Sequence, residues 1–348
     1  MPEIRYDPIK WRWIIISPER GRRPEEYILE KEEIPKPEFC PFCPGHENST
    51  PPEVFAIRPN GGPPNSSGWI VRVISNKFPA LRVEEEVWRR GESIYDVICG
   101  TGAHEVIIET HDHAKTIYDM SQDDWRYVFI SYRERIRDLE KDKRLRYFLI
   151  FKNYKKEAGI SLTHPHSQLI AGPVVPPVVR IELDSAREHY RKKERCIFCD
   201  ILINETEKEK RVIYDDGNFL AFCPFTSAFP FEVWLFPKKH IHNFSVFSDF
   251  EISNLASSFS FLLPRYKEVL GDVPMNFVFH NAPPNIPRAG HIDYWSTIEL
   301  DYHFHIEFIP RITRFGGFEI GGGIYINPTP PEIAASYMKK PEQKNLKT

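Results

Sequence analysis

The chain lacks an excess of charge of either sign, because 46 lysine and arginine residues are balanced by 49 aspartate and glutamate residues among 348. A protein that grips nucleic acid through its phosphates needs a basic surface, so the net charge of -3 disfavours nucleic-acid binding. The sequence also lacks an apolar run of the ~18 residues that a membrane span needs. Charged residues stand near its start, where a signal peptide would be apolar. We therefore expect a cytoplasmic protein with no membrane or nucleic-acid partner.

Cysteine is also scarce, and four of the six cysteines lie in two Cys-x-x-Cys pairs, Cys40 with Cys43 and Cys196 with Cys199. In a chain without a secretion signal, such pairs indicate metal ligands or a redox dithiol before they indicate disulfides. The 41% of hydrophobic residues can form a substantial core. The length indicates about two domains, or one large domain built by duplication.

Several segments of the first half recur in the second half in the same order. The aligned pairs are 104–113 with 231–240, 121–124 with 248–251, 147–151 with 275–279, and 164–168 with 303–307. Ser121 with Asp124, and Ser248 with Glu251, each fit a capping box at the start of a helix. Matching blocks in constant order indicate an internal duplication. We expect an α+β protein of two mainly antiparallel sheets, each covered by helices, with halves at residues 1–180 and 181–348.

The short run from His164 to Gln168 carries polar side chains at alternate positions. If this segment is a strand, His164, His166 and Gln168 emerge on the same face. A single histidine is more often a satisfied structural residue than a catalytic one. A row of three polar groups on one sheet face is costly to bury unless each meets a ligand, a metal or a partner. The pattern therefore favours a catalytic strand.

These segments together resemble the galactose-1-phosphate uridylyltransferase family of the histidine-triad superfamily. Its signature His-Pro-His-x-Gln stands here at residues 164–168. Similarity covers nearly the whole chain and includes residues 13–24, 40–43, 76–81 and 229–238. The resemblance implies a duplicated histidine-triad-like fold.

It also implies an activity, the exchange of UMP between UDP-glucose and galactose 1-phosphate or another hexose 1-phosphate. In this ping-pong reaction His166 would attack the α-phosphorus and form a covalent uridylyl-histidine, while Gln168 would hydrogen-bond the phosphoryl oxygens. Sugar phosphate is a good leaving group, so the neutral amide suffices and no strong general acid is needed. Hydrolase branches of the superfamily carry a third histidine in place of the glutamine. Gln168 therefore argues for transfer to a sugar phosphate and against a nucleotide hydrolase.

The resemblance further assigns substrate contacts. Asn76 and Phe78 match positions that hold the base and ribose, and Glu319 matches a contact to the hexose. The arginines Arg20 and Arg23 match residues that reach a neighbouring subunit's site, which implies a homodimer. The remaining matches surround the phosphate, at Asn153, Gly159 and Ser161.

Zinc is the implied cofactor, held by Cys₂His₂ sets typical of closed structural sites. The first set is Cys40, Cys43, His113 and His164. The duplication predicts a second set at Cys196, Cys199, His240 and His303. An alternative second metal site of bacterial family members maps to Glu182, His280, His305 and Glu307, where Glu307 replaces an expected histidine.

Local departures from the uridylyltransferase pattern leave the donor open. Lys77 stands where an aspartate is expected and Tyr325 where a glutamine is expected, and the glycine-rich residues 314–327 look more like the branch that acts on ADP-glucose. An adenylyltransferase or phosphorylase acting on ADP-glucose is therefore the alternative within the same chemistry. A zinc-binding nucleic-acid or scaffold module is a remote alternative, disfavoured by the near-zero net charge.

Overall fold

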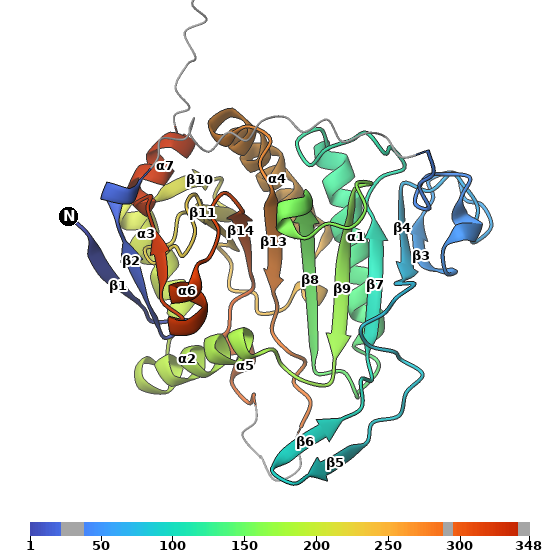
Figure 1. Cartoon of the computed structure of the whole chain (residues 1–348), viewed down its shortest axis with the longest axis horizontal. Helices are drawn as coiled ribbons and strands as arrows, with labels where there is room; N and C mark the ends of the chain where they lie inside the picture. Colours follow the sequence, from blue (N-terminus) through green and yellow to red (C-terminus); the bar gives the residue numbers. More distant parts are fainter. Residues whose placement is uncertain (22–37, 288–294, 340–348) are drawn as a thin grey trace, which may run out of the picture.

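A sheet of ten strands runs through the protein in the computed structural model, which describes residues 1–21, 38–287 and 295–339 (Figure 1). Its strand order is β3, β4, β7, β9, β8, β13, β14, β12, β11, β10, and all neighbours are antiparallel. The strand bounds are β3 (Glu53–Ile57), β4 (Val71–Ser75), β7 (Ala103–Ile108), β8 (Tyr147–Tyr154), β9 (His166–Gly172), β10 (Val212–Asp215), β11 (Phe219–Phe222), β12 (Val233–Pro237), β13 (Met275–His280) and β14 (His305–Pro310).

Two smaller sheets and a set of helices complete the described part of the chain. One small sheet joins β1 (Glu3–Asp7), β2 (Arg12–Ile16) and β15 (Tyr325–Asn327), and the other pairs β5 (Arg89–Glu92) with β6 (Tyr95–Ile98). The α-helices are α1 (Gln122–Leu139), α2 (Pro177–Lys193), α3 (Ile197–Lys208), α4 (Asp249–Leu270), α5 (Ile298–Asp301), α6 (Gly317–Gly322) and α7 (Pro331–Lys339). Within these residues no helix is both long and apolar enough to cross a membrane.

The strand order of the large sheet is symmetric about its centre, as an internal duplication requires. From the edge inward, β3, β4, β7, β9 and β8 of one half correspond to β10, β11, β12, β14 and β13 of the other. The α+β class and the duplicated arrangement are confirmed.

The two expected sheets are in fact one continuous sheet, because β8 pairs with β13 across the join. In the order of the sheet, each of these strands is the innermost of its half. Their pairing satisfies backbone groups that two separate sheets would leave at open edges. The division predicted near residue 180 falls inside α2, and the two domain ranges stay a prediction.

Both predicted capping boxes are present at the starts of the two long helices. The Asp124 backbone N–H donates to Ser121 Oγ at 3.2 Å, and the Ser121 backbone N–H donates to the Asp124 carboxylate at 2.8 Å. The same reciprocal pair links Ser248 and Glu251 at the start of α4. Each box satisfies two of the N–H groups that a helix start leaves unpaired.

The main core lies between these two helices and one face of the large sheet. The Phe259 ring of α4 lies 4.8 Å from Phe129 of α1 and 4.9 Å from Phe308 of β14, measured between ring centroids. Ile107 and Leu169 also point into this core. Because side chains alternate along a strand, His166 and Gln168 point to the opposite face. The α1 and α4 face therefore holds the main core. The opposite face carries a second apolar cluster, which includes Phe198 and Phe236, and also presents His166 and Gln168.

Replacing Phe259 by alanine should lower the free energy of unfolding by ~3–5 kcal/mol, because the cavity would lie where the two halves share one core. Phe250→Ala is a matched control on the same helix, since Phe250 is 65% exposed, and it should change stability by less than ~0.5 kcal/mol. Chemical denaturation of both variants measures the difference. Equal stability losses would mean that Phe259 does not join the halves.

Candidate active site

The first residue of β9, His166, is held in one tautomer by the backbone. Its Nδ1 lies 2.8 Å from the carbonyl oxygen of His164. A carbonyl can only accept, so Nδ1 carries the proton and Nε2 keeps the lone pair. Burial, with a contribution from the Lys152 charge, lowers the pKa of His166 to about 4, so the ring is neutral near pH 7. A neutral imidazole with a defined lone pair is a competent nucleophile.

Gln168 stands two residues along on the same face, and its side chain is held by a residue that the sequence did not single out. Gln168 Oε1 lies 2.8 Å from Nε2 of His104 on β7. The Ala80 backbone N–H donates to His104 Nδ1 at 3.1 Å. His104 is in a β-rich run, but only the pairing of β7 with β9 brings it beside Gln168.

A buried ion pair supports the strand from the other face of the sheet. Lys152 Nζ lies 2.5 Å from the Glu109 carboxylate and donates to the His166 carbonyl at 3.1 Å. Both side chains are almost fully buried. A buried charge is tolerated only when it is paired in this way. Sequence patterning missed this pair because a charged residue inside an otherwise apolar strand has no periodic signal.

The structure brings the first predicted metal ligands together at the start of β9. Cys43 Sγ lies 3.4 Å from His113 Nδ1 and 3.6 Å from His164 Nδ1, and Cys40 Sγ lies 3.7 Å from His164 Nδ1. Tetrahedral zinc with bonds of ~2.0–2.3 Å places its ligands roughly 3.3–3.8 Å apart. The four donors therefore fit such an ion.

The outer nitrogens of these two rings are also engaged, as the ligands of a metal require. His164 Nε2 lies 2.8 Å from the Thr110 carbonyl, and His113 Nε2 lies 3.1 Å from the Thr163 hydroxyl. The carbonyl can only accept from His164, which leaves Nδ1 of that ring free of a proton and directed at the sulfurs.

The second predicted set repeats this geometry. Cys199 Sγ lies 3.3 Å from His240 Nδ1 and 3.5 Å from His303 Nδ1, and the four donors of the set, completed by Cys196, all lie within 4.8 Å of one another. The outer nitrogens of both rings are engaged here too, by the backbone carbonyls of Pro237 for His303 and of Glu299 for His240.

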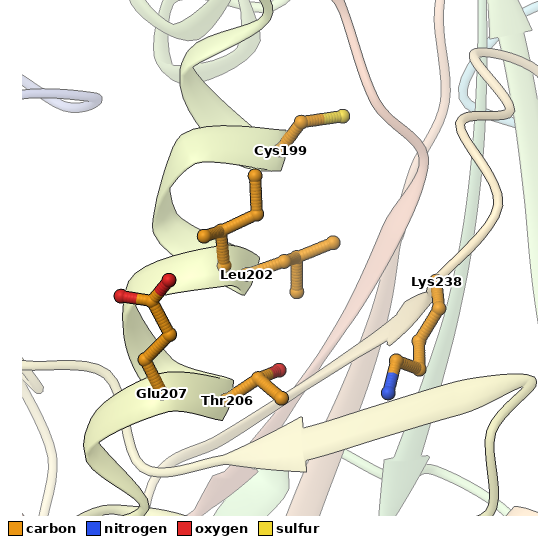
Figure 2. A pocket seen from close by; sticks show the side chains of 6 residues that line it. Cys199, Leu202, Thr206, Glu207 and Lys238 are labelled. Carbon is orange, nitrogen blue, oxygen red and sulfur yellow. The ribbon is translucent and has the colours of Figure 1, made fainter.

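A pocket of about 330 Å³ borders this set. Figure 2 shows the Cys199 sulfur at one end of the pocket, with Leu202, Thr206 and Glu207 further along α3 and Lys238 opposite them. The second set can therefore be approached through this pocket.

The alternative second site is also assembled, but a lysine lies inside it. Glu182, His280, His305 and Glu307 lie together and buried. The Lys10 ammonium contacts Glu307 directly and lies 3.7 Å from Glu182. Glu182 Oε1, His280 Nε2 and His305 Nε2 make no hydrogen bond within the described residues.

A divalent ion on these four residues would sit beside a buried ammonium, where burial weakens the screening of their repulsion. Burial disfavours a charged His280, but the charges of Glu182 and Glu307 outweigh it and raise its pKa to about 9. With His280 protonated, the carboxylates of Glu182 and Glu307 already face two cations, Lys10 and His280. The residues as arranged therefore do not fit a metal unless Lys10 moves away.

This cluster occupies the position in the second half that His166 and Gln168 occupy in the first. His305 Nδ1 lies 3.1 Å from the His303 carbonyl, which repeats the contact between His166 and His164. Glu307 takes the place of Gln168, and Glu182 adds a second carboxylate. The neutral amide beside His166 is thus replaced by a carboxylate beside His305, and Lys10 pairs with that carboxylate.

Several predicted substrate contacts lie near His166, and others do not. Asn76 Nδ2 lies 3.1 Å from His104 Nε2, and the Phe78 ring that follows is 83% exposed. Asn153, at the end of β8, donates to the Gly159 carbonyl at 3.3 Å. The backbone of Gly159 is left-handed, with φ of 95°, which favours glycine there. Ser161 is exposed in the same loop.

Arg20 and Glu319 are not brought to His166 within the chain. Arg20 ends a short 3₁₀ helix after β2, and Glu319 lies on α6 with its carboxylate accepting from the Gly316 N–H at 2.9 Å. In Figure 1, β2 and α6 lie on the side of the second half, away from β7 and β9. Arg23 lies outside the described residues.

Two family models match the chain. One, described as the N-terminal domain of galactose-1-phosphate uridyl transferase, matches residues 1–176, and the C-terminal domain of the same family matches residues 148–328. An ADP-glucose phosphorylase from Arabidopsis thaliana is 33% identical over 97% of this chain and 93% of the relative. A galactose-1-phosphate uridylyltransferase from Thermotoga maritima is 28% identical over 98% of this chain and 99% of the relative.

The same similarity holds in three dimensions. A crystal structure of an ADP-glucose phosphorylase from Arabidopsis thaliana with bound ADP-glucose has a TM-score of 0.79 at 31% identity, and covers 98% of this chain and 99% of that one. A structure described as uridylyltransferase has a TM-score of 0.72 at 31% identity, with 97% of each chain covered.

Proposed function

Because the chain belongs to the galactose-1-phosphate uridylyltransferase family, we propose that it transfers a nucleotidyl group from a nucleoside diphosphate hexose through a covalent intermediate on His166. The observation that carries this proposal is the hydrogen bond between His166 Nδ1 and the His164 carbonyl. It leaves Nε2 as the nucleophile on the sheet face that also holds Gln168.

In the first step, the Nε2 lone pair forms a bond to the α-phosphorus. The bond from that phosphorus to the bridging oxygen breaks, and hexose 1-phosphate leaves with the electron pair. The imidazole becomes positively charged, and the hydrogen bond from Nδ1 to the carbonyl strengthens as it does. In the second step, a phosphate oxygen of the acceptor attacks the same phosphorus and His166 is released neutral.

Two donors fit this chemistry, and we place ADP-glucose first. Lys77, Tyr325 and the glycine-rich residues 314–327 depart from the uridylyltransferase pattern. The relative named for ADP-glucose also has the higher identity, 33% against 28%. With inorganic phosphate as acceptor, the products would be ADP and glucose 1-phosphate. UDP-glucose with galactose 1-phosphate, the pair expected from the sequence, is the second candidate, supported by the family model and the Thermotoga maritima relative.

Initial rates with each donor and its acceptor decide between these candidates. We expect kcat/KM for ADP-glucose to exceed that for UDP-glucose by ~100-fold, a discrimination of about 2.7 kcal/mol in the transition state. His166→Asn should abolish turnover of both donors while keeping the thermal stability of the native chain. A reversed preference would restore UDP-glucose as the donor, whereas turnover by His166→Asn would overturn the covalent step itself.

We also propose that the active form is a homodimer in which Arg20 and Glu319 act on the partner's site. The elements that carry these residues lie away from β9 (Figure 1). Large apolar side chains are exposed on the same elements. Trp11 comes just before β2, Trp13 is on β2, and Ile320 is on α6. A second copy of the chain would cover such a surface.

Mixing two inactive variants tests this arrangement. Arg20→Ala and His166→Asn chains, each inactive alone, should form hybrid dimers that contain one intact site. Random pairing in equal amounts should restore roughly a quarter of the native activity, because half of the dimers are hybrid. If Arg20 acts within its own chain, the mixture stays as inactive as its components.

We propose zinc as the ion of both Cys₂His₂ sets. The spacing of the donors and the engaged outer nitrogens support a closed structural site at each. Zinc there supplies rigidity and takes no part in the transfer. At the first set, Cys40, Cys43 and His113 would fix His164, and through its carbonyl the ring of His166. Lys10 argues against a third ion at the Glu182 cluster.

Elemental analysis of the purified chain should return close to two zinc equivalents. Cys40→Ser and Cys196→Ser should each lose about one, since a Cys₂His₂ site holds its ion through all four ligands. A third equivalent that disappears in Glu182→Gln would show that the Glu182 cluster binds metal despite Lys10. A single equivalent unaffected by Cys196→Ser would mean that the second set is empty.

A further inference from the structure

We propose that His104 is a positioning residue that sets the orientation of the Gln168 amide, an inference that rests on the proposed transfer through His166. The role follows from the hydrogen bonds around the His104 ring, and none of its partners is a metal ligand. Its consequence is that the Gln168 NH₂ group, and not its oxygen, is presented to the phosphoryl oxygens of the substrate.

The tautomer of His104 is fixed by a backbone group that cannot rotate. The Ala80 N–H donates to His104 Nδ1 at 3.1 Å, so Nδ1 is the acceptor and the proton of the neutral ring is on Nε2. Asn76 Nδ2 also lies 3.1 Å from Nε2. Since Asn76 Oδ1 is engaged by the Phe78 N–H at 2.9 Å, this nitrogen is a donor, and its approach to Nε2 is not a hydrogen bond.

The Nε2–H group then selects one of the two orientations of the Gln168 amide. It donates to Gln168 Oε1 at 2.8 Å. The flipped amide would place its NH₂ group against another donor, which loses this hydrogen bond and leaves a partly buried carbonyl oxygen elsewhere. With Oε1 held by His104, the Gln168 NH₂ group has no hydrogen-bond partner among the described residues and can donate to anionic phosphoryl oxygens. Such charge-assisted bonds are stronger than neutral ones.

The duplication argues that this histidine serves chemistry and not the fold. Val106 pairs with Gln168 in the first half and Trp234 pairs with Glu307 in the second, so Gln168 corresponds to Glu307. His104 then corresponds to Glu232, one residue from the match that the sequence alignment gives. The two halves share the same strand order, so the fold does not require a histidine there. The histidine and the glutamine occur together in the half that carries the proposed nucleophile.

His104 also connects two parts of the proposed site. Its ring accepts from Ala80, and its backbone carbonyl accepts from the Asn76 N–H at 2.7 Å. The segment 76–80, which would hold the base and ribose, is therefore tied to the strand that holds the phosphate. A change at His104 should act on the rate of transfer more than on donor affinity, because the Gln168 bonds strengthen as charge moves onto the phosphoryl oxygens.

A double-mutant cycle in the full-length chain tests the proposal, with ADP-glucose and UDP-glucose each assayed as donor. His104→Ala should lower kcat by ~10-fold with little change in KM, and His104→Gln, whose amide can still donate to Oε1, should recover part of the loss. In the Gln168→Ala background, His104→Ala should change kcat by less than ~2-fold, because its effect passes through Gln168. His189→Ala, which removes an imidazole on α2 that pairs with Asp200, should leave kcat unchanged.

Multiplicative losses in the double variant, or a His104→Ala enzyme with native kcat, would overturn the positioning role. His104→Gln keeps the test decisive if the alanine variant is unstable, since a glutamine variant as slow as Gln168→Ala would contradict the proposal as well. His166→Asn is assayed alongside. If His166→Asn is active, the proposed transfer fails; if it is inactive and the cycle is multiplicative, only the role of His104 fails.

Discussion

The contact between His166 Nδ1 and the His164 carbonyl is the interaction on which the proposed chemistry depends. It joins the candidate nucleophile to a residue whose own ring points into the Cys₂His₂ cluster. His164 lies two residues before His166, just ahead of β9, so a fixed His164 also fixes the carbonyl that orients the His166 ring. The buried pair of Lys152 and Glu109 contacts the same strand from the opposite face of the sheet, where Lys152 donates to the His166 carbonyl. A neutral imidazole in a single tautomer is the result.

The duplicated fold builds this arrangement twice, and charge separates the two copies. His305 repeats the backbone contact of His166, and the second Cys₂His₂ set repeats the first. In the second half, however, Glu307 and Glu182 replace a neutral amide with carboxylates, and Lys10 reaches in from the loop between β1 and β2. The copy with the neutral Gln168 amide beside His104 is the one to which we assign the transfer. The second copy supports the sheet through a buried network of paired charges.

Features set by neighbours in sequence could be predicted, and features set by distant packing could not. The capping boxes at Ser121 and Ser248 each involve only a serine and the acidic residue three positions later. Because the chain is duplicated, the box found in one half also supported the box predicted in the other. The first metal set followed from a Cys-x-x-Cys pair and the family resemblance, and the repeat then predicted the second set. Lys10 and His104 were missed because their partners depend on how the β1–β2 hairpin packs and on the pairing of β7 with β9. The union of two sheets through β8 and β13 was missed because an edge strand carries no sequence mark of its partner.

The covalent intermediate is the central claim, and intact-protein mass spectrometry tests it most directly. After the chain is mixed with ADP-glucose or UDP-glucose without an acceptor, its mass should rise by that of one AMP or one UMP group. Peptide mapping should place the group on the His166 side chain, and addition of phosphate or galactose 1-phosphate should remove it. Turnover with no added mass, or an adduct on another residue, would contradict transfer through His166.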